Sequence, residues 1–95
     1  MTEKLTDRSA LQPLLSNDWE LDEERDAISK RFVFEDFVEA FGWMTSVAIA
    51  AEKMKHHPEW FNVYRTVKVN LTTHDCSGLS ALDVQLAQTM DQMAG

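Results

Sequence analysis

Two stretches near the start of the chain alternate between apolar and polar positions, as strands of a half-buried sheet do. The alternation is clearest in AISKRFVF, residues 27–34, which separates into two sets: Ile28, Lys30, Phe32 and Phe34 against Ser29, Arg31 and Val33. The shorter DWELD, residues 18–22, is a second strand candidate, and DEERD between them is typical of a turn. The pattern therefore predicts a pair of neighbouring strands.

The apolar period changes from two to about 3.6 after Glu35. It predicts a helix of about 18 residues that ends near Met54. The expected buried stripe of this helix carries Phe37, Phe41, Met44, Val47, Ala48 and Ala51. Its aromatic residues are interpreted as core packing and not as a cofactor site.

Two further helices are expected at the ends of the chain. In TDRSALQPLLSND, Thr6 is the expected N-cap and Pro13 should disturb the later part of a short helix. Near the C-terminus, Ser80 followed three residues later by Asp83 has the outline of a capping box. The expected buried face of that last helix carries Leu82, Leu86, Thr89 or Met90, and Met93.

The stretch EWFNVYRTVKVNLTT allows two interpretations. As one continuous strand, residues 60–72 would span roughly 40 Å at about 3.3 Å per residue, which would separate His57 from His74. As a hairpin around Tyr64-Arg65-Thr66 with Val63 opposite Val67, it would bring His56 near His74. That register places one set of side chains on the apolar face: Phe61, Val63, Val67, Val69 and Leu71. A register shifted by one would put His57 opposite His74 instead. The hairpin is the interpretation we adopt, although its turn contains no glycine.

These elements predict a single α+β domain over residues 1–95. Its expected order is helix, two strands, long helix, two strands, helix (α-β-β-α-β-β-α). With four antiparallel strands and helices on one face of the sheet, the expected architecture is a two-layer sandwich.

Composition narrows the functional classes. The net charge of −7 argues against nucleic acid or an anionic membrane as the main partner, because both require a basic surface. The one cysteine cannot form an intrachain disulfide, and no signal-like or membrane-spanning apolar run is present, so a cytoplasmic protein is expected. A chain of 95 residues buries a modest core, which makes self-association a natural source of further burial.

The chemistry-bearing residues are three histidines, grouped as His56 and His57 in KHHPEW and His74 in TTHDC. Imidazole titrates near neutral pH, so such a group suits proton transfer at a pocket. A zinc site with Asp75 or Glu52 as a fourth ligand and an ordinary polar loop are the alternatives, but the usual zinc-ligand spacings are absent.

Four neighbouring residues have possible supporting roles. Glu52 lies one helical turn before His56 and could orient it. Trp60 offers a flat wall for a heteroaromatic ligand, or packs in the core. Cys76 is more typical of a small packing residue than of a nucleophile. Asp83 is expected mainly as a helix cap, with a ligand contact possible.

The motifs AEKMKHHPEWFNVY and LTTHDCSGLS, followed by Asp83, closely resemble the pterin-4a-carbinolamine dehydratase family. The paired motifs are specific, and the resemblance extends over residues 19–93 with the strand and central helix of residues 25–54. It implies dehydration of a 4a-hydroxytetrahydropterin to the quinonoid dihydropterin, in the recycling of the cofactor of aromatic amino acid hydroxylases. It implies no cofactor or metal for the chain itself.

The resemblance also implies site residues and partners. The catalytic set would be His56, His57 and His74, with His56 and His74 as the acid/base groups and His57 mainly holding the substrate. The pterin would lie against residues 56–58 and 73–76, with support from Glu52, and the implied binding residues are Glu52, His56, His57, Pro58, Trp60, Thr73, His74, Asp75 and Cys76. Family members form dimers or tetramers, so a homo-oligomer is expected.

Two positions depart from the animal members of the family. Lys55 stands where an acidic residue is expected, and Leu82 stands where an arginine is expected before Asp83. These changes affect the charge at the pocket rim and leave the histidines intact. Animal relatives also act as dimerisation partners of a homeodomain transcription factor, so a non-catalytic interaction module is the alternative function.

Overall fold

Four antiparallel strands form the sheet of the computed structural model, which describes residues 2–95. The strands lie in the order β1-β2-β4-β3, so β1 and β3 are the edges. Their bounds are β1 (Glu20–Asp22), β2 (Ala27–Val33), β3 (Glu59–Val63) and β4 (Thr66–Leu71). Every pairing in the sheet is antiparallel, as the sequence predicts.

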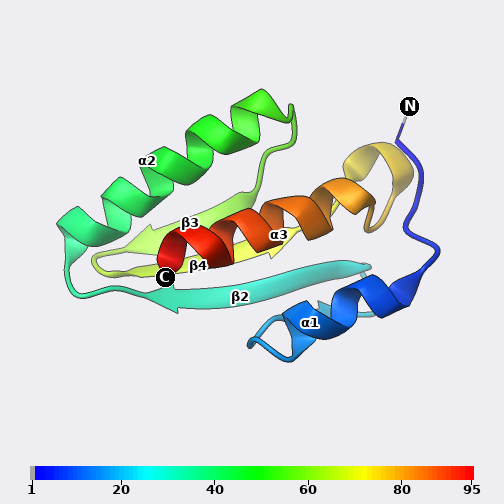
Figure 1. Ribbon diagram of the computed structural model, residues 1–95, viewed down its shortest axis with the longest axis horizontal. Helices are drawn as coiled ribbons and strands as arrows, with labels where there is room; N and C mark the ends of the chain where they lie inside the picture. Colours follow the sequence, from blue (N-terminus) through cyan, green and yellow to red (C-terminus); the bar gives the residue numbers. More distant parts are fainter. Residues whose placement is uncertain (1) are drawn as a thin grey trace.

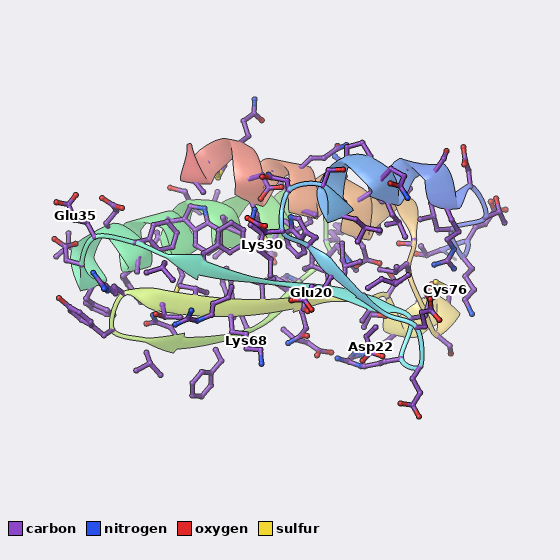
Figure 2. The ribbon with its side chains drawn as sticks, turned by 90° about the horizontal axis from the view of Figure 1, so that it is seen from below. Glu20, Asp22, Lys30, Glu35, Lys68 and Cys76 are labelled. Atoms are coloured by element: carbon purple, nitrogen blue, oxygen red, sulfur yellow. The ribbon has the colours of Figure 1, made fainter. Side chains whose placement is uncertain are left out.

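The helices pack on one face of this sheet. Figure 2 shows the two layers from the side, with helices above the strands. The helical elements are α1 (Gln12–Leu15), α2 (Phe37–Lys53) and α3 (Ala81–Ala94), with 3-10 turns η1 (Arg8–Leu11) and η2 (His74–Cys76). The predicted α+β class and element order are therefore confirmed (Figure 1). Within residues 2–95 the structure contains no helix with the length and apolar character that a membrane crossing needs.

The core lies between the sheet and the helices α2 and α3. Its sheet side comes from β2 and β4, where Ile28, Phe32, Val67, Val69 and Leu71 are buried. The ring of Phe32 lies 4.5 Å from that of Trp43 on α2, between centroids. Fully burying a side chain of this size stabilises the fold by about 1.5–3 kcal/mol, so this layer holds the two helices in place.

The expected buried stripe of α2 is wrong in its aromatic members. Phe37 and Phe41 are 45% and 53% exposed, and Ala48 is also exposed. The helix instead buries the neighbouring face, formed by Ala40, Trp43, Val47 and Ala51. The two faces share Val47 and Ala51, so the sequence period fits both. The large Trp43 ring fills the space above Phe32 and Phe34, and this fixes the rotation of the helix.

The expected hairpin is present, but its register is wrong by one residue. Val63 pairs with Thr66, so the turn contains two residues, Tyr64 and Arg65. Tyr64 takes the left-handed conformation (φ 52°), because a two-residue hairpin turn requires a positive φ at its first central residue. Phe61 and Val63 consequently lie on the outer face, 67% and 59% exposed. Neither expected register is observed: the pairing runs from Val63 with Thr66 to Glu59 with Asn70, and the histidines lie outside the strands.

The ends of the terminal helices differ from expectation in detail. Asp7, not Thr6, caps the first turn by accepting a hydrogen bond from the Ser9 backbone. Pro13 stands in the first turn of α1, where a missing N–H costs nothing, so it does not disturb the helix. The capping box of α3 is confirmed, whereas Met93, near the C-terminal end of that helix, is 46% exposed.

One charged residue lies on the inner face of the sheet. Lys30 points toward the helices and Lys68 away from them (Figure 2). The Lys30 Nζ atom lies 2.7 Å from Asp91 Oδ1, and the Trp19 Nε1 atom donates to the other oxygen of that carboxylate at 2.9 Å. The pairing offsets the cost of burying the ammonium group and joins α3 to β2.

The C-terminal end of α2 determines where the next residues go. Lys55 N–H donates to the Glu52 carbonyl and His56 N–H donates to the Ala51 carbonyl, both at 3.1 Å. This is the Schellman arrangement, in which the residue after the cap takes a left-handed conformation and is usually glycine. Here that residue is Lys55, with φ 53°. The left-handed residue turns the chain back and directs His56 toward the interior.

Replacing Lys55 by glycine should therefore stabilise the fold. Glycine adopts this conformation without the steric cost of a Cβ atom, a difference of about 1 kcal/mol in the free energy of unfolding. Chemical denaturation of Lys55→Gly should show the gain. The matched control is Lys53→Gly, two residues earlier in the helix, which should lose about 1 kcal/mol. Equal losses in both variants would contradict this account of the helix end.

Candidate active site

A pocket of about 560 Å³ opens where the end of α2, the η2 turn and the start of β3 meet. Figure 1 shows these segments at the same end of the sheet as the N-terminal segment. Six of the predicted site residues line the pocket, namely His56, His57, Pro58, Thr73, His74 and Asp75. The prediction that the three histidines gather in space is therefore confirmed.

Three predicted site residues do not line this pocket. Trp60 points into the helix layer, with its ring 6.2 Å from that of Trp43. Cys76 is partly buried and its Sγ contacts backbone carbonyls, including that of Gly78 at 3.4 Å. Glu52 lies behind His57 and contacts the site only through that ring. The pocket has five further lining residues, Thr2, Lys55, Glu59, Thr72 and Leu82.

His56 is the buried histidine of the site, 8% exposed. Its Nε2 atom lies 2.6 Å from Asp83 Oδ1, at the start of α3. A carboxylate can only accept, so Nε2 carries the hydrogen and the neutral ring leaves Nδ1 as its acceptor. Nδ1 has no hydrogen-bond partner within residues 2–95. Every buried polar side-chain atom in these residues has a partner, so Nδ1 is accessible from the surface.

Asp83 is fully buried and its carboxylate has three partners. Besides His56, Oδ2 accepts hydrogen bonds from the Ser80 backbone at 2.9 Å and from Thr73 Oγ1 at 2.7 Å. The Ser80 hydroxyl lies 2.7 Å from the same Thr73 oxygen. Burial of a charge without such partners costs several kcal/mol, so the network makes this position possible. The sequence indicated the cap, and its contact with His56 was not predicted.

His57 is paired with Glu52, which corrects the expectation that Glu52 orients His56. The His57 Nε2 atom lies 2.8 Å from Glu52 Oε1, and both side chains are mostly exposed, at 64% and 79%. The turn at Lys55 moves His56 off the helical position that faces Glu52, and His57 takes its place. This exposed pair is held weakly in comparison with the buried one.

His74 is paired with Glu59, a residue that the sequence did not single out. Its Nε2 atom lies 3.0 Å from Glu59 Oε2, and the same oxygen binds the Arg25 guanidinium. Arg25 first, and His74 second, lower the pKa of Glu59 to about 2, so this side chain is a carboxylate throughout the neutral range. The only sequence signal was the position of Glu59 between the His-His-Pro motif and a strand.

The loop that carries His74 is held at both of its ends. Thr73 and Gly78 exchange backbone hydrogen bonds, at 2.9 and 3.2 Å. A Cβ atom at Gly78 would lie 2.3 Å from Asp26 Oδ2, so a larger residue there would have to displace the Asp26 carboxylate. The Thr2 backbone N–H donates to Asp75 Oδ2 at 2.8 Å and lowers the pKa of Asp75. The N-terminal segment thus forms part of the pocket wall.

The three histidines share one arrangement. Each presents Nε2 to its own carboxylate, which leaves Nδ1 without a protein partner among the described residues. In the neutral ring Nδ1 accepts a proton, and in the protonated ring it donates one. The site is therefore suited to giving a proton at one point of a ligand and removing one at another. The part of the chain from Thr2 onward contains no group of acidic, histidine and cysteine side chains arranged to hold a metal ion.

Comparison with known proteins gives a consistent result. The family model described as "Pterin 4 alpha carbinolamine dehydratase" matches residues 3–93. A protein of Roseobacter denitrificans bearing the name of this dehydratase is 61% identical, over 100% of both chains. The pterin-4-alpha-carbinolamine dehydratase of Drosophila melanogaster is 55% identical over 88% of this chain and 44% of its own length.

Solved structures share the fold. The Brucella melitensis structure titled "transcriptional coactivator/pterin dehydratase" has a TM-score of 0.89 and 41% identity, and covers 98% of this chain and 100% of that one. A pterin dehydratase-like protein described as a RuBisCO assembly factor of the alpha-carboxysome has a TM-score of 0.72. At 20% identity, over 82% of this chain and 90% of that one, the second shows the fold alone.

The Asp83→Asn variant should change which ring nitrogen of His56 carries the hydrogen. Ser80 and Thr73 both donate to this side chain, so the amide oxygen of asparagine should stay toward them. Its NH₂ group then faces His56, which must accept at Nε2. Ring nitrogen-15 chemical shifts should report the move of the hydrogen to Nδ1. Stability should fall by about 1–3 kcal/mol. An unchanged His56 tautomer would contradict the assigned contact.

Proposed function

Because the chain belongs to the pterin-4a-carbinolamine dehydratase family, we propose that it dehydrates 4a-hydroxytetrahydrobiopterin to quinonoid dihydrobiopterin by histidine acid/base catalysis. Its relatives are named as this dehydratase, and a dehydratase is a lyase, so the chain belongs to the lyases. The observation that supports the mechanism best is the set of three carboxylate-held histidines at one pocket. A pocket of about 560 Å³ has the size of small-molecule sites.

The reaction needs two proton movements. A base removes the proton on N5, and an acid protonates the 4a-hydroxyl, so that the C4a–O bond breaks and water leaves. The electron pair of the N5–H bond forms the new double bond, and the atoms balance without a redox partner. Because the uncatalysed dehydration is not very slow, a few kcal/mol of barrier reduction is sufficient, within the range of acid/base catalysis.

The proposed roles follow the surroundings of each ring. His56 and His74 are the acid/base pair, since each lines the pocket and has its Nε2 atom held by a carboxylate. His57 is part of the catalytic set and mainly holds the substrate, in keeping with its exposed pairing to Glu52. Pro58, Thr73 and Asp75 are proposed as contacts of the pterin.

Three of the expected binding residues do not line the pocket, and they are proposed to support the site without touching the pterin. Glu52 supports the site through His57. Trp60 supports it from the core side of β3. Cys76 supports it as part of the loop that carries His74. The partner in metabolism is proposed to be an aromatic amino acid hydroxylase, and the compartment the cytoplasm, where the single free cysteine would stay reduced.

Self-association is the second part of the proposal. Large apolar side chains are exposed along α2 and at the hairpin, namely Phe37, Val38, Phe41, Ile49, Phe61, Val63 and Tyr64. The hairpin strand β3 is also a sheet edge with unpaired backbone groups. Surfaces of this kind are usually covered in solution. A second copy of the chain is the occupant that we propose, as a dimer or a tetramer.

The exposed apolar surface also supports an alternative function. The Brucella relative is titled as a transcriptional coactivator as well as a pterin dehydratase. A non-catalytic interaction module would use α2 and the hairpin and would not need the histidines. A dehydratase assay separates the two functions.

The direct test is the decay of 4a-carbinolamine generated by a phenylalanine hydroxylase. The protein should accelerate this decay, and His56→Ala and His74→Ala should each lower kcat by at least about tenfold. The double variant should be inactive, whereas Glu23→Gln, an exposed change in the β1–β2 turn, should be fully active. Decay unchanged by stoichiometric protein would overturn the dehydratase proposal and favour the interaction module.

Light scattering tests the self-association. The protein should be a dimer or tetramer at micromolar concentration, and Phe41→Asp should shift it toward monomer by placing a charge in the apolar surface. Gln88→Asp, an exposed position on α3 outside these surfaces, controls for the added charge alone. A wild-type monomer at this concentration would refute the proposal.

A further inference from the structure

His74 differs from His56 in how little holds it. It lies on the three-residue turn η2, and its side chain is 78% exposed, against 9% for His56. Its one side-chain hydrogen bond within residues 2–95 is the contact of Nε2 with Glu59 Oε2 at 3.0 Å. An exposed imidazole on a short turn can rotate freely unless a fixed partner holds it. The position of His74 therefore depends on Glu59.

Glu59 is itself fixed from two sides. It is the first residue of β3 and pairs with Asn70 of β4, so its backbone belongs to the sheet. Its carboxylate binds Arg25, which comes from the turn between β1 and β2 and reaches past the end of β4. Since β2 and β3 both flank β4, Arg25 joins the two sides of the sheet at the pocket. A chain of contacts runs from Arg25 through Glu59 to His74.

The two contacts have different effects on the ring. The ionised Glu59 oxygen accepts only, so it favours the neutral ring form with the hydrogen on Nε2. That form leaves Nδ1 free to take up a proton. The Arg25 guanidinium keeps the carboxylate charged and holds it when the ring is unprotonated. Glu52, the partner of His57, has no such cation, because its one side-chain hydrogen bond and ion pair in the described chain is with His57.

We propose that Arg25 and Glu59 are positioning residues of the dehydration, acting together through His74 by fixing its orientation and its tautomer. This inference rests on the proposed function, in which His74 transfers a proton. Neither residue needs to touch the pterin in this role. Glu59 acts on the ring directly, and Arg25 acts on Glu59.

Kinetics of Glu59→Gln test the role in the reaction. Glutamine has the same size, but it can donate as well as accept, so it no longer selects one tautomer. We expect kcat to fall about tenfold with KM changed less than about twofold. Arg25→Met should give a smaller loss of kcat, and Arg25→Lys should recover much of it because the charge returns. Glu23→Gln and Arg65→Met are matched controls, since both side chains are exposed and lie outside the pocket.

A double variant tests whether Glu59 acts through His74. In the His74→Ala background, Glu59→Gln should cause no further loss, because the ring that Glu59 holds is gone. The same tenfold loss in both backgrounds would overturn the proposal, since Glu59 would then act on the substrate or on the fold. Unchanged kcat in Glu59→Gln alone would overturn it too.

Nitrogen-15 shifts of the His74 ring give a readout that needs no substrate. The wild-type ring should be in the Nε2–H form, and Glu59→Gln should give a mixture of the two tautomers. An identical tautomer in both proteins would overturn the positioning by Glu59. If the wild-type protein failed to accelerate carbinolamine decay, the proposed function would fall, and these shifts would still decide whether Glu59 positions His74.

Discussion

The buried carboxylate of Asp83 is the contact on which the site and the fold jointly depend. One oxygen accepts from His56 after the end of α2, and the other accepts from Ser80 and Thr73 before the start of α3. The same group therefore caps one helix and holds the residue that leaves the other. Because an unpaired buried charge costs several kcal/mol, loss of any one of these partners should destabilise the contacts of the others. This coupling explains how a sheet with a small core can hold a histidine in a defined orientation.

The three histidine–carboxylate pairs differ in how many contacts hold them. The His56 pair is buried within a network, the His74 pair is exposed but anchored by Arg25, and the His57 pair is exposed at the end of a helix. Rigidity is needed where a proton must be transferred over a short distance, since a misplaced donor loses most of its effect. Freedom is acceptable where a side chain only contacts a ligand. This difference agrees with the division of roles that we propose.

Local sequence patterns predicted the elements better than the faces that they bury. The class, the element order, the capping box of Ser80 and the gathering of the histidines followed from periodicity, turn residues and resemblance. The rotation of α2 did not, because Phe37, Phe41 and Trp43 all satisfy a helical period and only packing against Phe32 decides among them. The hairpin register failed for a similar reason, since Tyr64 in a left-handed turn leaves no mark in the sequence. Glu59 was missed because its partners, Arg25 and His74, are distant along the chain.

The N-terminal segment has a practical consequence. Thr2 donates to Asp75 and Leu5 donates to the Leu79 carbonyl, so this segment lies along the loop that carries His74. Any polypeptide joined ahead of it, such as an affinity tag, would leave the protein at the mouth of the pocket. The other terminus lies at the far end of α3, away from that opening (Figure 1). Purification tags and surface attachment therefore belong on the C-terminal side, where they leave the pocket wall as it is.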